Sequence, residues 1–401
     1  MIYRYLRIIL KGRGITINYP YLPVSDDIKL IKNESSDGVI LLVKQMQSSE
    51  YLAGLQLLTE QNERNQEREF AGFSDLEVIY YYVHRKTHIR EDRNKAVGTR
   101  REYLRNLLQF YKYIVEGSRY LKEDVEDYIE GEHFKNLRPR HIANFHEYLS
   151  TAPLGKQNKP YTAATIQSKS AVLKAFLRWM YEIGHIRFPL YEKVLYASIS
   201  DNEIPNKDLY PDEAFTIIDY YKNHPVNYAL FTTLMITGLR ISEICNAKWK
   251  DITFDYSNGQ YWLEGIGKRK RPFLKRISPV YFERIKEYRK RRKLPVVIDL
   301  LDNTPLFPDR NQKSYTSKNL SNYIIKAILD TKLPFLKGRE KRITPHSFRH
   351  AFAIYLYREG ADLYTIQKEL GHSDPKTTTR YLEKAFKKEN SAGYFIKDTS
   401  F

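Results

Sequence analysis

Apolar side chains recur at helical spacing in two long segments of the first half of the chain. Within residues 99–117 they share one helix face that a glycine ends: Leu104, Leu107, Leu108, Tyr111 and Ile114. Residues 161–184 repeat the stripe with Leu173, Phe176, Leu177 and Met180. Lysine and arginine occupy the other faces. The pattern predicts a small helical bundle with a basic exterior.

The second half of the chain combines helical patterns with a short strand region. Thr344 precedes Pro345, as an N-cap precedes a first-turn proline, and Gly360 and Gly371 are helix stops. Strands are expected within 260–279, on either side of a basic turn. Helices are expected over 211–223, 226–236, 344–360, 362–370 and 375–388. The predicted fold class is mainly α with a small β-sheet (α+β).

Prolines and composition suggest the boundaries between domains. Pro189 and Pro205 lie in a stretch that resembles an interdomain linker. The expected parts are an N-terminal extension over 1–72, a helical domain over 73–190, a linker over 191–206 and a second domain over 207–401. In the extension, residues 28–31 and 38–43 look like short strands, and residues 58–70 look like a polar helix.

The charge of the chain points to a polyanionic partner. Its 401 residues include 66 Lys and Arg against 48 Asp and Glu, a formal charge of +18 with a sequence pI near 9.5. Such an excess suits nucleic acid or an acidic membrane surface. Residues 268–293 alone hold 13 Lys and Arg against 2 Glu. We expect DNA contacts from this run at Arg269, Arg271, Lys275 and Arg276.

Several classes of protein are disfavoured. A single cysteine, Cys245, leaves no intramolecular disulfide framework and no multi-thiolate zinc site, which fits a reducing compartment. No apolar run approaches the roughly 18 residues of a membrane helix. A membrane-surface role needs a continuous apolar helix face, which residues 282–293 lack. We therefore expect a cytoplasmic protein without a membrane partner.

Polar residues that suit phosphate chemistry gather in the second half. His346 and Arg349 are three residues apart, on one face of the first turn of a predicted helix, where the helix N-terminus favours an anion. His372 follows Gly371 at a helix end. Tyr381 comes nine residues later, in the next predicted helix, where a tyrosine beside a leucine is normally core packing. Arg240 is a catalytic candidate, or the structural partner of Glu243.

Taken together, the ordered set Arg240, Lys268, His346, Arg349, His372 and Tyr381 resembles the tyrosine recombinase (phage integrase) family, Xer-type members included. The segments that carry the resemblance are TGLRISEI, TPHSFRHAFA and LGHSDPKTTTRYL, with 23 residues from Arg349 to His372. The resemblance is strong over 207–390, extends to a helical core-binding domain over 73–187, and is absent over 1–72.

The resemblance implies a site-specific DNA recombinase, such as a mobile-element integrase, that forms a 3′-phosphotyrosyl intermediate without metal, ATP or other cofactor. Tyr381 would be the nucleophile, and two arginines would stabilise the phosphorane in place of a metal. Lys268 would protonate the leaving 5′-oxygen, with Lys270 as the alternative in the same basic turn. The implied roles also include Arg240 and Arg349 on the phosphate, His346 as proton acceptor, His372 as hydrogen-bond donor and Glu243 as their support.

The resemblance also implies an assembly. Two domains would clamp duplex DNA like a letter C, and four protomers would act on two DNA sites, with accessory or directionality proteins. The tail 382–401 would dock on a neighbour or fray, and residues 1–72 would bind arm-type DNA or a partner. The location would be the cytoplasm of a prokaryote, at the nucleoid. The alternatives are a type IB topoisomerase and a non-catalytic DNA-binding accessory factor.

Overall fold

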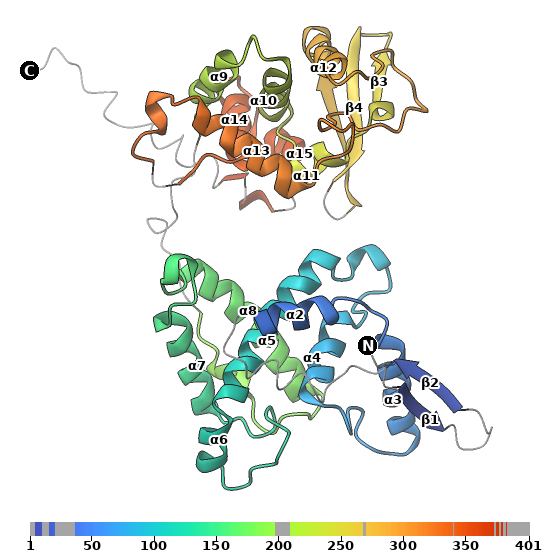
Figure 1. The fold of residues 1–401 in the computed structure, drawn as a ribbon, viewed down its shortest axis with the longest axis vertical. Helices are drawn as coiled ribbons and strands as arrows, with labels where there is room; N and C mark the ends of the chain where they lie inside the picture. Colours follow the sequence, from blue (N-terminus) through green and yellow to red (C-terminus); the bar gives the residue numbers. More distant parts are fainter. Residues whose placement is uncertain are drawn as a thin grey trace, which may run out of the picture. The chain divides into compact units, whose positions relative to one another are not determined.

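The computed structural model describes residues 5–9, 16–20, 37–196, 209–267, 270–339, 341–372, 374–376, 378–379 and 382. Contacts within the chain divide it into two compact units, Met1–Glu203 and Ile204–Phe401. Figure 1 shows helices in both units, a hairpin in the first and a larger sheet in the second. The predicted mainly helical fold with a small β-sheet is confirmed for the described residues.

The first unit is a helical bundle with one antiparallel hairpin, formed by β1 (Tyr5–Ile9) and β2 (Thr16–Pro20). Its α-helices are α2 (Asp37–Gln45), α3 (Leu52–Arg64), α4 (Asp75–His84), α5 (Val97–Glu116), α6 (Ser118–Asp124), α7 (Pro139–Thr151) and α8 (Ala163–Glu182). Short 3₁₀ turns cover Glu91–Arg93, Lys156–Asn158 and Leu190–Lys193. Helices α5 and α8 confirm the two amphipathic stripes, whose apolar residues are buried.

The start of this bundle differs from the sequence prediction. Residues 38–43 belong to helix α2, so the predicted strand there is wrong. Leu42 and Val43 are buried while Ile40 and Leu41 are exposed, a one-sided pattern of a helix. A short apolar run cannot be assigned to strand or helix by periodicity alone. The strand expected over 28–31 lies outside the described residues, and the polar helix is confirmed for 58–64.

One hydrophobic core of the first unit extends from Leu42 in α2 to Val194. Leu42, Met46 and Leu55 belong to the same cluster of buried residues as Leu107 and Phe176. The boundary expected at residue 72 therefore does not separate two cores. Burying the apolar face of α2 against α5 ties the early helices to the bundle.

The second unit joins a helical layer to a three-stranded sheet at one end (Figure 1). The strands β3 (Ile252–Asp255), β4 (Gln260–Ile266) and β5 (Pro272–Ile277) are antiparallel in the order β3-β4-β5. The helices are α9 (Pro211–Tyr220), α10 (Pro225–Thr237), α11 (Ile241–Asn246), α12 (Pro279–Arg291), α13 (Ser317–Asp330), α14 (Pro345–Arg358) and α15 (Leu363–Leu370). Two 3₁₀ turns cover Trp249–Asp251 and Pro334–Leu336.

These elements match the predicted helices at 211–223, 226–236, 344–360 and 362–370, and the strands within 260–279. The helix expected over 375–388 is described only at residues 375–376, 378–379 and 382, which are helical.

A glycine sets the closest approach between α10 and α14. Gly238 ends α10 in the left-handed conformation, at φ +57°. A Cβ there would lie 2.2 Å from the ring of Phe352, so a larger residue would not fit without movement. The turn after α10 consequently lies directly against α14, and it carries Arg240 towards the face of α14 that holds Arg349.

Candidate active site

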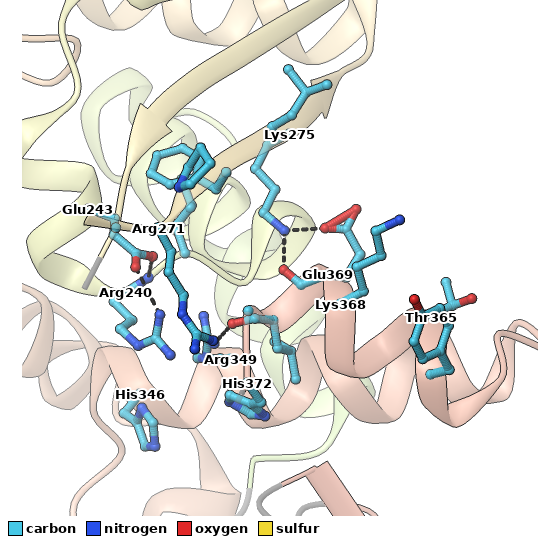
Figure 2. Close-up of a pocket in the computed structure, with 18 residues that line it drawn as sticks. Arg240, Glu243, Arg271, Lys275, His346, Arg349, Thr365, Lys368, Glu369 and His372 are labelled. Carbon is cyan, nitrogen blue, oxygen red and sulfur yellow. Dashed lines mark hydrogen bonds and ion pairs between the residues drawn. The ribbon is translucent and has the colours of Figure 1, made fainter. Parts of the chain in front are cut away.

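Residues from the three motif segments and from the ends of the basic turn line one cavity of about 770 Å³. Its walls come from the α10–α11 turn, the β4–β5 hairpin, the first turns of α14 and helix α15 (Figure 2). The charged and imidazole side chains that line it are Arg240, Glu243, Arg271, Lys275, His346, Arg349, Lys368, Glu369 and His372. Segments more than 100 residues apart in sequence thus contribute to a single site.

Arg240 is held at the wall of this cavity by Glu243. The backbone N–H of Arg240 donates to Oε2 of Glu243 over 2.8 Å, and its Nη1 donates to Oε1 over 2.9 Å. Glu243 is buried, whereas the Arg240 side chain is 29% exposed. A Cβ at Gly267 would lie 2.6 Å from Oε1 of Glu243, so the hairpin backbone closes over the carboxylate. The salt bridge that the sequence allowed is present, and it orients the guanidinium.

Arg349 lies at the floor of the cavity, with 3% of its surface exposed. Its Nη1 donates to the carbonyl of Gly238 over 2.6 Å, and its Nη2 donates to the carbonyl of Leu370. These contacts use two of the five N–H groups of the guanidinium. His346 lies one turn earlier on α14 and also lines the cavity, with its ring 4.9 Å from that of His350.

His372 is aimed into the cavity by the end of α15. Gly371 adopts φ +61°, and the His372 N–H donates to the carbonyl of Gln367 over 3.1 Å. Nδ1 of His372 lies 2.9 Å from the hydroxyl of the buried Thr378. Burial, followed by the positive charges of Arg349 and Arg240, lowers the pKa of His372 to about 4. Its imidazole is therefore neutral at pH 7.

The remaining predicted residues fall into three groups. Lys268, Arg269 and Tyr381 lie outside the described residues. Lys270 is exposed at φ +55°, and Arg271 is exposed at the mouth of the cavity. Arg276 is exposed on β5, where its Nε donates to Gln260 over 2.9 Å.

Lys275 does not lie on the surface where the basic run placed it. The side chain is 6% exposed, and its ammonium contacts both the carboxylate and the backbone carbonyl of Glu369 (Figure 2). Burial lowers the pKa of Lys275, while Glu369 opposes that shift. Side chains alternate along a strand, so Lys275 shares the buried face with Ile277, and Arg276 faces outward. DNA contact by Lys275 is not compatible with this placement.

Glu369 was not anticipated from the sequence. The burial of Lys275 could have been predicted, because residues two apart on a strand share a face and Ile277 is apolar. No comparable signal marks Glu369, because only the packing of α15 against β5 brings a carboxylate to this lysine.

The described residues contain neither a metal site nor a membrane-spanning helix. No group of three or more His, Cys, Asp or Glu among them is arranged to hold a metal ion. Within the same residues, no helix has the length and apolar character needed to cross a membrane.

Comparison with known proteins bears directly on this site. Residues 207–388 match the Phage integrase family. The tyrosine recombinase XerC of Syntrophus aciditrophicus (strain SB) is 26% identical over 307 residues, covering 72% of this chain and 88% of that protein.

Two solved structures share the fold. XerH site-specific recombinase bound to difH substrate gives a TM-score of 0.55 at 20% identity, over 95% of this chain and 100% of that one. A lambda integrase (75–356) dimer bound to a COC′ core site gives 0.51 at 16% identity, over 72% and 89%.

The helices of both units and the small antiparallel sheet thus form the fold that these recombinase structures share. Residues 207–388 place the second unit in the tyrosine recombinase, or phage integrase, family, as the motifs predicted.

Proposed function

We propose that this protein cleaves and rejoins DNA strands at a specific site through a covalent 3′-phosphotyrosyl intermediate, without metal or ATP. The strongest support is the convergence of Arg240, His346, Arg349 and His372 on one cavity. Two guanidinium groups and two imidazoles form a set that binds and polarises a phosphodiester. The cavity is also rich in cations, since its two carboxylates, Glu243 and Glu369, each pair with a basic side chain.

In the proposed reaction, the hydroxyl of Tyr381 attacks the scissile phosphorus. Arg240 and Arg349 donate to the non-bridging oxygens and stabilise the charge of the pentavalent transition state. The ordinary tyrosine pKa is about 10, so the phenol proton must be accepted by a base, for which we assign His346. The bond from phosphorus to the 5′-oxygen breaks, and Lys268 donates a proton to that oxygen, with Lys270 as the alternative donor.

His372 is assigned as a neutral hydrogen-bond donor. A neutral imidazole has one N–H, and its tautomer is set by the partner of the other nitrogen. If the Thr378 hydroxyl donates to Nδ1, the proton resides on Nε2, which can then donate to a phosphate oxygen. The products are a phosphotyrosine and a 5′-hydroxyl. Attack by the 5′-hydroxyl of another strand reverses the step and exchanges strands.

The proposed partner is double-stranded DNA, supported by the charge of +18 and by a structural relative, lambda integrase (residues 75–356), that is bound to DNA. Arg269, Arg271 and Arg276 are assigned to phosphate contacts, which hold the duplex without reading its sequence. We further propose a C-shaped clamp, a homotetramer on two DNA sites, accessory or directionality proteins, and action at the bacterial nucleoid.

The test uses duplexes from the DNA that flanks the gene, nicked so that cleavage becomes irreversible. We expect the wild-type protein to form an SDS-resistant DNA adduct with EDTA present, and Tyr381→Phe to bind the same duplex without forming it. An adduct in Tyr381→Phe would contradict the assignment of the nucleophile. Relaxation of supercoiled DNA at no defined sequence would instead indicate topoisomerase chemistry.

A further inference from the structure

The C-terminal end of α15 is bound at each of its last four carbonyl groups. An α-helix leaves these carbonyls without partners inside the helix. The carbonyl of Gln367 accepts from the His372 N–H over 3.1 Å, and that of Lys368 accepts from the Gly371 N–H over 3.0 Å. This is the usual backbone closure after a glycine in the left-handed conformation.

The last two carbonyls are bound by cationic side chains from other elements. The Lys275 ammonium, from β5, donates to the carbonyl of Glu369, and the Arg349 guanidinium, from α14, donates to that of Leu370. A positive charge at a helix C-terminus also interacts favourably with the helix dipole. The next residues after these carbonyls are Gly371 and His372. The segment that presents His372 is therefore held by one predicted catalytic side chain and by Lys275.

Lys275 makes a second contact with α15 and also lies near a ring of α14. Its ammonium pairs with the Glu369 carboxylate, and it lies 5.9 Å from the centre of the Phe352 ring. Phe352 is the ring that packs on Gly238, whose carbonyl accepts from Arg349. Lys275 thus belongs to the same packed assembly that supports Arg349.

We propose that Lys275 is a positioning residue, which holds the end of α15 so that His372 and Arg349 keep their places at the scissile phosphate. The inference rests on the proposed function for its catalytic consequence, but its effect on His372 exists in the free protein. Lys275 touches no reacting atom in this role; it acts through Glu369 and the backbone that leads to His372.

The first test measures single-turnover cleavage of a nicked duplex by the full-length protein. Lys275→Met removes both contacts while keeping an unbranched side chain. Displacing catalytic groups by about 1 Å can cost on the order of 100-fold, so we expect cleavage to slow by about 10- to 100-fold. The Kd for the duplex should change by less than about 3-fold, because phosphate contacts dominate affinity. Glu369→Gln keeps the backbone contact and should slow cleavage less than Lys275→Met.

The second test asks whether the loss acts through His372. In a His372→Ala background, Lys275→Met should slow cleavage by less than in the wild-type background, since residues that act as one unit are not additive. Equal losses in the two backgrounds would overturn the positioning role. A His372→Ala variant that cleaves at the wild-type rate would instead contradict the proposed function of His372.

The third measurement needs no DNA. It therefore distinguishes failure of the positioning role from failure of the proposed function. We expect NMR titration of the free protein to show the pKa of His372 rising in Lys275→Met, from about 4 towards 6.5, as the imidazole gains solvent. An unchanged pKa would overturn the inference, whatever the catalytic result.

If Lys275→Met fails to fold, the paired variant Lys275→Met/Glu369→Leu replaces the buried ion pair with apolar side chains. Such replacements are often tolerated, whereas breaking one partner alone is not. The carbonyl of residue 369 still loses its cation in the paired variant. It should therefore show the same rise in the pKa of His372, and an unchanged pKa there would overturn the inference as well.

Discussion

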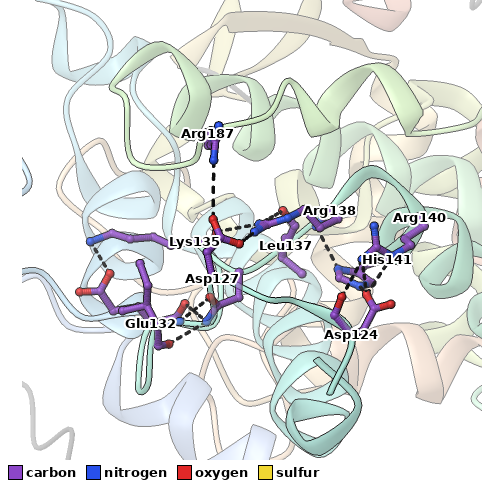
Figure 3. A network of polar contacts seen from close by, with 11 residues as sticks. Asp124, Asp127, Glu132, Lys135, Leu137, Arg138, Arg140, His141 and Arg187 are labelled. Atoms are coloured by element: carbon purple, nitrogen blue, oxygen red, sulfur yellow. Dashed lines mark hydrogen bonds and ion pairs between the residues drawn. The ribbon is translucent and has the colours of Figure 1, made fainter. Parts of the chain in front are cut away.

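Both units contain dense clusters of charged side chains, but the clusters differ in their balance. In the first unit each central carboxylate serves two basic groups (Figure 3). Asp124 accepts from Arg140 over 2.8 Å and lies 2.7 Å from Nε2 of His141. Asp127 pairs with Arg138 and Arg187. With the pair of Lys135 and Glu132, the network holds four cations against three carboxylates, so its charges nearly cancel.

In the cavity of the second unit the balance is different. Glu243 pairs with Arg240, but Arg349 is held by two backbone carbonyls, which supply dipoles and not a formal charge. The histidines show the consequence. Asp124 opposes the fall in the pKa of His141 that burial causes, whereas Arg349 and Arg240 add to the fall in the pKa of His372. A balanced network fixes chain segments; a cation-rich cavity retains attraction for an anion from outside.

The largest expected difference in cleavage rate is between substitutions of two arginines, one from each cluster. Arg349→Lys keeps a positive charge but loses the planar fork, so cleavage should slow by about 100- to 1,000-fold, as for loss of one transition-state donor. The matched variant Arg138→Lys, in the balanced network, should leave cleavage within about 3-fold. Single-turnover rates on the nicked duplex measure both. Equal losses in the two variants would remove the distinction between the clusters.

His84, which is 5% exposed, should contribute to the acid sensitivity of the first unit. Burial, followed by the charges of Arg100 and Lys95, lowers its pKa to about 4, against the hydrogen bond to Met46. The unfolded chain, with a pKa of 6.5, binds this proton first as pH falls. The free energy of unfolding should therefore drop between pH 6.5 and 4, by at most about 3 kcal/mol. Below pH 4, His84 should cause no further drop.

Urea denaturation at a series of pH values, followed by hydrogen exchange in α4, measures this slope. His84→Gln should flatten the slope between pH 6.5 and 4. A variant with the wild-type slope would show that another group is responsible.

A substitution at Gly267, in the wall of the cavity, should have a smaller effect on the cleavage rate. In Gly267→Ala the new Cβ would crowd Oε1 of Glu243 and displace the Arg240 guanidinium. We expect cleavage to slow by about 10-fold, consistent with modest misplacement of a catalytic group. Gly98→Ala, in α5 with nothing within 4 Å of a new Cβ, is the control and should cleave normally. Unchanged cleavage in Gly267→Ala would mean that Glu243 tolerates the displacement.

The smallest expected effect is a change in pKa on DNA binding, and it should differ between His84 and His372, whose pKa values are both about 4 in the free protein. Binding of the duplex to Tyr381→Phe should raise the pKa of His372, because a phosphate in the cavity favours the imidazolium. The pKa of His84, which does not line the candidate cavity, should not change. NMR titration of the free and bound protein resolves both. A shift at neither histidine would argue against phosphate binding beside His372.

Much of this picture was accessible from the sequence, in particular the helices with long apolar stripes. The places where prediction failed have local causes. Residues 38–43 form too short an apolar run to distinguish strand from helix, and Leu42 buries against a helix that is distant in sequence. Lys275 sits in a run so basic that charge suggested a surface, whereas strand alternation turns it inward.

The sequence by itself determined the elements and the chemistry of the site. Periodicity, caps and glycine stops marked α5, α8, α14 and α15, and the motifs identified Arg240, His346, Arg349 and His372 as the residues to examine. These signals are local, because they depend on spacing along a single helix or turn. Tertiary structure alone decided which groups share an environment. The carbonyls that hold Arg349, the carboxylate that meets Lys275 and the cations that add to the effect of burial on the pKa of His372 come from segments far apart in the chain. Only packing brings them within reach.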